Sequence, residues 1–573
     1  MVSKPFESKI QDIVYNVDVG IGLRLIKAGL YLLFLLALTV VYTATQFRGL
    51  TSPEAMDYAQ VGRNIALKGG FTTEYIRPVS MWYLIEHSPS HDPMIQDHPD
   101  IVHAPLYPLL LAAGFKSLES AFMSDKPTST YPPEQWVIVP FGHLCTILTG
   151  LFLFLIGRRL FDQRVAMLGT TMYFLSDSVW AASISGTPLS LATLLTVLAF
   201  YALLTAAANR TDGRPFSACL IPYLLCALFC ILAFLARYAL AVLVPAVLLF
   251  IVWSFRENRY RWAVGFVLIF LVGISPWLIR NVNVSGGILG LAPLLAFNGN
   301  DPVTGSLFER TFLQTPDLGP KLHQLQIKWL TNMAGLLSGD ILTLGDGILA
   351  SLFITTFLYN FSRDHVRRLR WCIALAMLLL MVVGACFGPV TTNLLHIFWP
   401  FAILYGLSFF FILLERLQIR IPIARLAIIV AVVALGALPL LFTLLPPRAA
   451  PPYPPYFPPY ITHVCRMIKA EELLATDMPW ATAWYGDRNS LALPASIDDF
   501  YEINDYTKRI SGIYFTTITR DREYVRTLLT GEYRTWFPLL EGRIPSDFPL
   551  TQGFPLNNLD QLFLTDRPRW LEK

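Results

Sequence analysis

Charged residues are scarce in this chain. Asp, Glu, Lys and Arg make up 15% of its 573 residues, whereas roughly a quarter is usual for a soluble domain. Hydrophobic residues make up 54%, and they gather in runs of about 20 residues, the length that crosses the hydrocarbon of a bilayer. This composition excludes an ordinary soluble fold. We predict an all-α polytopic membrane protein.

Several motifs of other protein classes are also missing. No glycine-rich loop of the G-x-G-x-x-G kind follows a strand-like segment, which argues against a dinucleotide-binding fold. Neither an H-E-x-x-H motif nor a metal-type pair of cysteines occurs, and six of the seven cysteines lie in or beside apolar runs. The net charge of +4 is accounted for by basic loops between the runs. We therefore expect no nucleic-acid partner.

The apolar runs predict eleven membrane spans. The eighth is interrupted by Asp346 and by several glycines. The expected spans cover residues 28–45, 136–157, 165–184, 187–207, 217–235, 238–255, 262–279, 341–360, 371–388, 393–414 and 426–445.

Basic residues mark every second connection between these spans. The short turns near Ser185 and Pro389 hold no Lys or Arg. The positive-inside rule then predicts a cytoplasmic N-terminus in a bacterial plasma membrane. The loops 46–135 and 280–340 and the tail from 446 would face outward. The basic connections hold Arg158, Arg159 and Arg164; Arg210 and Arg214; Arg256, Arg259 and Arg261; Arg363, Arg367, Arg368 and Arg370; and Arg416, Arg420 and Arg425.

A proline-rich stretch separates the membrane region from the tail. Residues 446–460 predict a semi-rigid linker. Residues 461–573 are long enough for a small domain. Alternation over 482–485 and 511–518 predicts strands, and residues 521–529 predict a helix. We expect a small outer α/β domain.

Two carboxylates stand out in the first outer loop. Ser52-Pro53-Glu54 is a typical helix start, and Asp57 follows three residues later on the same helix face. One interpretation is that both acids only cap a surface helix. The other is that one of them acts as a general base, with a pKa raised by partial burial.

Four histidines lie in the same loop. His87 and His91 are four residues apart, which would suit a metal on a helix, but Pro89 between them indicates a loop. We expect no required cofactor and no metal site, although the residues do not exclude a divalent ion. His103 differs from the other histidines because it directly precedes the return to the membrane at Ala-Pro-Leu-Tyr107-Pro.

Polar residues at the outer ends of spans are the remaining candidates. Arg237 and Arg280 end two spans, and isolated arginines there either extend toward lipid headgroups or grip an anion. His396 lies near them in the predicted topology, and it either joins them or bonds to a neighbouring helix. Asp177 lies in the outer half of the third span, where a lone carboxylate is costly unless it is used or paired.

Three segments together resemble the GT-C glycosyltransferases. They are Pro53-Glu-Ala-Met-Asp-Tyr-Ala-Gln-Val-Gly-Arg-Asn-Ile-Ala66 followed by Gly69-Gly-Phe71, then His103-Ala-Pro-Leu-Tyr-Pro108, and Pro276-Trp-Leu-Ile-Arg-Asn281. The branch that they resemble includes the protein O-mannosyltransferases and the aminoarabinose transferases. The resemblance covers about residues 28–445. One departure is that the family's adjacent Asp-Glu pair is here Pro53-Glu54, with Asp57 three residues on.

The resemblance implies a GT-C-like catalytic region over residues 1–445. A sugar would arrive on a polyprenyl phosphate, and a first-loop carboxylate would activate a hydroxyl of a lipid, glycan or protein acceptor for inverting attack. We predict Asp57 as the base, with Glu54 as its substitute. The leaving lipid phosphate would be held by Arg237, Arg280 and His396. Arg63, His103, Tyr107 and Asp177 are the predicted substrate contacts.

Two other classes of function stay open. A transporter or flippase of a lipid-linked solute would place charges near mid-membrane and often shows internal repeats; this chain has few such charges and no evident repeat. The altered acidic pair is also compatible with a non-catalytic relative that acts as an assembly partner.

Overall fold

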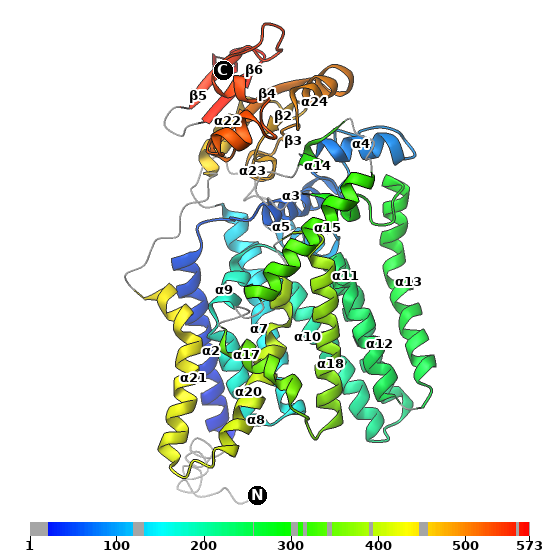
Figure 1. Ribbon diagram of the computed structural model, residues 1–573, viewed down its shortest axis with the longest axis vertical. Coiled ribbons are helices and arrows are strands. Elements are labelled where there is room, and N and C mark those ends of the chain that lie inside the picture. Colours follow the sequence, from blue (N-terminus) through cyan, green and yellow to red (C-terminus); the bar gives the residue numbers. More distant parts are fainter. Residues whose placement is uncertain are drawn as a thin grey trace, which may run out of the picture.

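The chain forms a bundle of helices with a small sheet at one end (Figure 1). The computed structural model describes residues 21–117, 131–255, 257–298, 307–312, 318–340, 347–388, 394–445, 457–556 and 561–571. The bundle helices are α2 (Ile21–Gln46), α7 (Val139–Leu160), α8 (Gln163–Phe174), α9 (Asp177–Ile184), α10 (Leu189–Thr211), α11 (Phe216–Ala236), α12 (Leu243–Ser254), α13 (Arg259–Ser285), α17 (Ile348–Thr355), α18 (Asp364–Gly384), α20 (Trp399–Arg416) and α21 (Pro422–Leu444).

Seven of the described helices are long and apolar enough to cross a membrane. They match seven of the predicted spans within a few residues. Three shorter apolar helices follow: Leu106–Lys116, Tyr238–Ser254 and Ile348–Leu358. The mostly helical fold class predicted from composition is therefore confirmed. The long apolar helices are Leu25–Gln46, Glu134–Leu160, Leu189–Thr211, Phe216–Ala236, Arg259–Ser285, His396–Arg416 and Pro422–Leu444.

Two predicted spans differ from the helices observed. The third is broken into α8 and α9, because Ser176 takes an extended conformation and its hydroxyl bonds Ser178 at 2.9 Å. Ser-Asp-Ser is a helix-start signal that hydropathy does not record. In the eighth, the described part is only α17 with a short 3₁₀ turn (η5, Thr356–Leu358). Asp346 lies outside the described residues.

The loop that follows α2, called the first loop below, is itself mostly helical. It contains α3 (Pro53–Lys68), α4 (Pro78–His87) and α5 (Leu106–Lys116), joined by β1 (Tyr75–Ile76). The helix start predicted at Ser52-Pro53 is confirmed: α3 begins at Pro53 and ends at Gly69 in the left-handed conformation. The segment that follows α13 contains η3 (Ala292–Phe297), α14 (Leu307–Arg310), α15 (Leu318–Gly335) and η4 (Leu336–Asp340).

The sheet joins two distant parts of the sequence. Its order is β1-β3-β2-β4-β6-β5. The first four strands run parallel to one another, β6 is antiparallel to β4, and β5 is antiparallel to β6. The strands β2 and β4 are buried throughout, as expected of parallel strands covered on both faces. Thus β1, from the first loop, forms an edge of the C-terminal sheet. The C-terminal strands are β2 (Leu473–Thr476), β3 (Asn489–Ala492), β4 (Ile510–Phe515), β5 (Gln552–Leu556) and β6 (Gln561–Thr565).

The α/β character predicted for the tail is confirmed, with two local corrections. The strand expected at 511–518 is β4, but residues 482–485 lie in helix α23 (Pro479–Gly486). Pro479 suits the first helical turn. Residues 479–485 are all buried, so the alternation of residue types there did not indicate a strand. The helix expected over 521–529 is one wide turn, Tyr524–Leu529. Most of the predicted proline-rich linker, residues 446–456, lies outside the described residues.

The remaining C-terminal elements pack around this sheet (Figure 1). Trp480, Trp484 and Trp536 are among the largest fully or almost fully buried side chains. The elements are α22 (Pro458–Arg466), α24 (Ile497–Glu502), η7 (Ile503–Thr507), α25 (Thr517–Arg520), η8 (Tyr524–Leu529), α26 (Phe537–Leu540) and η10 (Arg569–Leu571).

Arg63 on α3 joins the first loop to the C-terminal domain. Its guanidinium donates to the carbonyls of Ala483 (2.9 Å) and Trp484 (2.8 Å), the last turn of α23, where carbonyls lack helical partners. It also pairs with Glu74 at 2.6 Å, and both side chains are about 95% buried. The contact between α3 and the C-terminal domain therefore rests on a buried cation.

We expect Arg63→Met to destabilise the protein by about 3–5 kcal/mol, because it leaves the buried Glu74 carboxylate short of a cation. Lys68→Met is the matched control: Lys68 pairs with the same carboxylate at 2.7 Å but is half exposed, so its loss should cost about 1 kcal/mol or less. Thermal or denaturant unfolding of the purified protein measures both. Equal losses in the two variants would contradict this role for Arg63.

Candidate functional site

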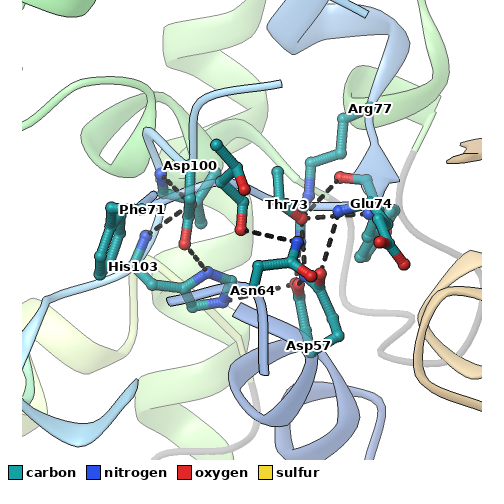
Figure 2. A network of polar contacts seen from close by, with 12 residues as sticks. Asp57, Asn64, Phe71, Thr73, Glu74, Arg77, Asp100 and His103 are labelled. Atoms are coloured by element: carbon teal, nitrogen blue, oxygen red, sulfur yellow. Dashed lines mark hydrogen bonds and ion pairs between the residues drawn. The ribbon is translucent and has the colours of Figure 1, made fainter. Parts of the chain in front are cut away.

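Asp57 lies at the centre of a polar network between three segments of the first loop (Figure 2). Its Oδ2 accepts from Arg77 at 2.7 Å and lies 3.4 Å from Nε2 of His103. Its Oδ1 accepts from Gln60 at 3.0 Å. The side chain is 2% exposed. Both carboxylate oxygens are thus held by donors within the protein.

Gln60 and Arg77 fix the second segment of this network. Gln60 donates to Thr73 and accepts the backbone N–H of Glu74 at 2.9 Å, which aligns residues 73–77 along α3. Arg77 then reaches Asp57, and its guanidinium lies 3.9 Å above the ring of Tyr75. The sequence analysis missed Arg77, because an Arg-Pro pair in a loop carries no sign of a distant carboxylate.

His103 joins the third segment to the network. Its Nδ1 contacts Asp100 at 2.8 Å (Figure 2). Its ring packs on Tyr58, with 4.3 Å between the ring centroids. Burial alone would lower the pKa of His103, but the Asp100 and Asp57 carboxylates outweigh it and raise the pKa. Burial would raise the pKa of Asp100, yet His103 and the backbone N–H of Val102 hold that pKa well below its usual value. This geometry favours an imidazolium between two carboxylates.

Glu54 and Arg237 form a second, more accessible ion pair. Their side chains meet at 3.1 Å and are 33% and 20% exposed. Arg237 ends α11, where the backbone turns to an extended conformation before η2 (Tyr238–Val242). The next residue, Tyr238, donates to the His103 carbonyl at 3.1 Å and accepts from Trp277 at 2.7 Å. These bonds bring the end of α11 up to the first loop.

Both ion pairs line one cavity of about 480 Å³, a size typical of small-ligand sites. Its charged wall holds Glu54, Asp57, Arg77, His103, Arg237 and Glu309. Another part of the wall is apolar. It holds Val383 and Phe387 at the end of α18, Leu394, and four residues after α13, namely Leu289, Ala292, Pro293 and Leu295. Tyr75 and Trp480, the latter from the C-terminal domain, complete the wall. The cavity is therefore amphipathic.

Four of the nine predicted site residues line this cavity, namely Glu54, Asp57, His103 and Arg237. Arg280 is not among the lining residues. Its guanidinium donates to the carbonyls of Asp100 (2.7 Å) and Phe71 (3.2 Å), which holds two segments of the first loop in place. His396 lines a separate small cavity with Tyr173 and Thr193, so the structure does not bring it to Arg237.

The other three predicted residues lie in packed surroundings. Arg63 bonds the C-terminal domain, as described above. Tyr107 is 2% exposed and donates to the Gly186 carbonyl at 2.8 Å. Asp177 begins α9 and accepts from Tyr42 at 3.2 Å. None of the three is among the residues that line the amphipathic cavity.

Two lining residues that sequence reasoning missed are Glu309 and Trp480. Glu309 lies 3.7 Å from Nε of Arg77. A lone acid in a long loop and a tryptophan in a distant domain carry no local signal. In the described parts of the chain, no group of three or more His, Cys, Asp or Glu side chains is arranged to hold a metal ion.

Comparison with known proteins identifies the architecture. Residues 132–279, about a quarter of the chain, match the family model of dolichyl-phosphate-mannose-protein mannosyltransferases. The solved structure of apo ArnT from Cupriavidus metallidurans superposes with a TM-score of 0.54 at 12% identity, covering 94% of this chain and 98% of that one. The chain has the GT-C glycosyltransferase fold.

Two further structures agree with this GT-C fold. ArnT bound to undecaprenyl phosphate gives a TM-score of 0.53 at 12% identity, with 94% and 98% coverage. The oligosaccharyltransferase AglB from Archaeoglobus fulgidus, in complex with an inhibitory peptide and a dolichol-phosphate, gives 0.50 at 12% identity and covers 88% of this chain and 72% of that one. No curated protein sequence matches. The resemblance predicted from sequence is confirmed, and the chain is an integral membrane protein.

The raised pKa of His103 predicts a pH dependence of stability. Between about pH 6.5, the pKa of an unfolded histidine, and the raised value, the folded protein holds a proton that the unfolded chain has lost. This stabilising contribution is complete below about pH 6.5 and is lost as the pH rises through the folded pKa. Thermal unfolding between pH 6 and 9 should show a falling midpoint in the wild type and a shallower fall in His103→Gln.

His98→Gln is the control for this measurement. His98 is also buried, and burial lowers its pKa to about 4, so it is neutral in the folded state and about 90% neutral or more in the unfolded state above about pH 7.5. His98→Gln should keep the wild-type slope in that range. The assignment of His103 fails if His103→Gln keeps that slope as well.

Proposed function

We propose that this chain transfers a sugar from a polyprenyl-phosphate donor to a hydroxyl of an acceptor. The observation that carries the proposal is the amphipathic cavity, in which the Glu54–Arg237 pair lies beside an apolar wall. A lipid-linked sugar has the same division into tail, phosphate and polar group. The GT-C fold supports it, since solved structures of ArnT and AglB hold undecaprenyl phosphate and a dolichol-phosphate.

In the proposal, Arg237 binds the donor phosphate. A guanidinium is always charged and matches a phosphate with two parallel hydrogen bonds. Arg237 lines the cavity together with the apolar residues Val383, Phe387 and Leu394, which suit the first units of a polyprenyl chain. A phosphate at this guanidinium would compete with its present partner, Glu54. Donor binding would therefore release a carboxylate next to the sugar.

The released Glu54 is our candidate for the general base. It faces the cavity and is a third exposed, and its ion pair with Arg237 uses one carboxylate oxygen. Asp57, the base favoured from sequence, is 2% exposed and has donors at both oxygens. Protonating Asp57 would leave the buried Arg77 without its closest carboxylate. We infer that Asp57 positions Arg77 and His103, and that Glu54 takes the proton.

The chemical step then balances within the cavity. The acceptor O–H gives its proton to Glu54, and its oxygen attacks the anomeric carbon from the face opposite the phosphate. The bond between that carbon and the phosphate oxygen breaks, so the configuration inverts. The negative charge that develops on the leaving lipid phosphate is stabilised by Arg237, a cation that lines the cavity.

The base assignment predicts different outcomes at the two carboxylates. Glu54→Gln should lower sugar transfer by about 10²–10⁴-fold. It should leave the unfolding midpoint nearly unchanged, since a partly exposed ion pair contributes about 1 kcal/mol or less. Asp57→Asn should instead lower the free energy of unfolding by about 3–5 kcal/mol, because it leaves buried cations unpaired. Transfer from polyprenyl-phosphate sugars in proteoliposomes, with thermal unfolding alongside, measures both. Normal transfer by Glu54→Gln would refute the assignment.

Competition between Glu54 and phosphate predicts opposite effects on binding. Arg237→Gln should lower the affinity for undecaprenyl phosphate by at least about tenfold, the loss of one charge-assisted contact. Glu54→Gln should bind it as tightly as the wild type or more tightly. Native mass spectrometry or calorimetry in detergent measures the Kd values.

Arg210→Gln is the matched control for Arg237→Gln. Arg210 is 23% exposed, close to the 20% of Arg237. It precedes α11 while Arg237 follows it, so the helix separates them by about 30 Å. Arg210→Gln should bind undecaprenyl phosphate like the wild type. Equal loss in both arginine variants would mean that the phosphate does not occupy the cavity.

A further inference from the structure

Two buried donors in the cavity wall have no hydrogen-bond partner. They are Nε1 of Trp480 and Nε of Arg77, and neither atom has a partner among the residues that the structure describes. The side chains are well fixed, since Trp480 is 2% and Arg77 7% exposed. An unpaired buried donor costs about 1–3 kcal/mol, and each one in a native fold calls for an explanation. A ligand with oxygen acceptors would supply the missing partners.

Trp480 is held in the wall by the docked C-terminal domain. It lies in the first turn of α23, whose last turn is bound by Arg63. The next two aromatic residues of this helix, Trp484 and Tyr485, both donate to Glu134 at 2.8 Å. The helix is therefore fixed at its far end to two elements of the membrane region. These contacts hold the backbone of Trp480 at the cavity wall.

Trp480 forms an aromatic corner with Tyr75. Their rings are 6.2 Å apart and inclined by 64°. The guanidinium of Arg77 covers the other ring, that of Tyr75, at 3.9 Å, and Glu309 approaches Nε of Arg77 to 3.7 Å. Aromatic faces, fixed N–H donors and a carboxylate are the groups that suit a sugar, which has apolar C–H faces and hydroxyls that both donate and accept.

Contacts link the aromatic corner to the carboxylates of α3. A chain of contacts runs from Trp480 to Tyr75, from Tyr75 to Arg77, and from Arg77 to Asp57. Glu54 lies one turn before Asp57 on α3 and pairs with Arg237. A sugar attached to a phosphate at Arg237 would therefore lie beside Glu54, in the same cavity that Tyr75 and Trp480 line.

We propose that Trp480 and Tyr75, with Arg77 and Glu309, bind the glycosyl group of the donor. The inference rests on the proposed function and adds where the sugar is recognised. Phosphate recognition then belongs to the membrane region, and sugar recognition depends on a tryptophan of the C-terminal domain. Trp480 acts as a specificity-determining residue: its ring packs on the sugar, and its N–H donates to a sugar hydroxyl.

The test compares one lipid with and without its sugar, using the full-length protein in detergent. The probes are undecaprenyl phosphate, mannosyl-phosphoryl-undecaprenol and aminoarabinosyl-phosphoryl-undecaprenol. In the wild type at least one glycosylated lipid should bind more tightly than undecaprenyl phosphate. Trp480→Phe, which keeps a ring and removes the N–H, should weaken that glycosylated lipid about 3- to 10-fold. It should leave the Kd of undecaprenyl phosphate unchanged.

Trp536→Phe is the matched control. Trp536 is a fully buried tryptophan of the same domain, it is not among the cavity-lining residues, and its Nε1 donates to the Pro494 carbonyl at 2.9 Å. Trp536→Phe should lower the unfolding midpoint. It should still bind the glycosylated lipid more tightly than undecaprenyl phosphate, by the same factor as the wild type. Trp480→Phe should keep the midpoint, because its N–H bonds nothing among the described residues.

The outcomes separate this inference from the proposed function. If the wild type binds none of the three lipids, the proposed function falls and the glycosyl site falls with it. If undecaprenyl phosphate binds but neither sugar adds affinity, the glycosyl site alone is overturned. The same holds if Trp480→Phe keeps the wild-type ratio of the Kd values of the glycosylated lipid and undecaprenyl phosphate. A selective loss in Trp480→Phe with a wild-type midpoint supports it.

Discussion

The fold around the cavity depends on one constraint: Asp57 is a carboxylate buried almost completely beside a membrane region. An isolated charge there would be strongly destabilising, so cations must converge on it. Arg77 supplies one and His103, held by Asp100, supplies the other. These partners come from separate segments of the first loop. Their convergence ties α3, the β1 segment and the return to the membrane into one body. The neighbouring Glu54 is left at the cavity, where it meets Arg237 from the bundle.

The same loop also docks the C-terminal domain. The strand β1 pairs with β3 in parallel, with Tyr75 opposite Ser490, and Arg63 binds the last turn of α23. One part of the loop therefore contacts the C-terminal domain, while another part lines the cavity. Because Tyr75 belongs to both, a disturbance of the sheet edge would be felt at the cavity wall. This coupling explains how a domain at the far end of the sequence contributes a residue to a site in the membrane region.

Sequence reasoning found the features that local patterns encode. Hydropathy located the long helices, and Ser52-Pro53 marked the start of α3. The acidic loop and the end of α11 gave Glu54, Asp57, His103 and Arg237, which all line the cavity. Sequence reasoning failed where the role of a residue depends on partners that are distant in the chain. Arg280 and Arg237 look alike at their helix ends, yet Arg280 bonds backbone carbonyls of the loop. His396 shares a predicted face with them but lies in another cavity.

The sequence by itself predicted a helical membrane protein with an acidic first loop, a small α/β tail and a resemblance to the GT-C glycosyltransferases. These properties follow from hydropathy, helix signals and motif order, which are local along the chain. Only the tertiary structure decided which charged side chains are buried in ion pairs and which face the cavity. Asp57 and Glu54 are similar acids in the sequence, and burial separates them: Asp57 is surrounded by donors, whereas Glu54 is a third exposed beside Arg237. Pairing and burial depend on contacts between residues far apart in the chain, so no local pattern could report them.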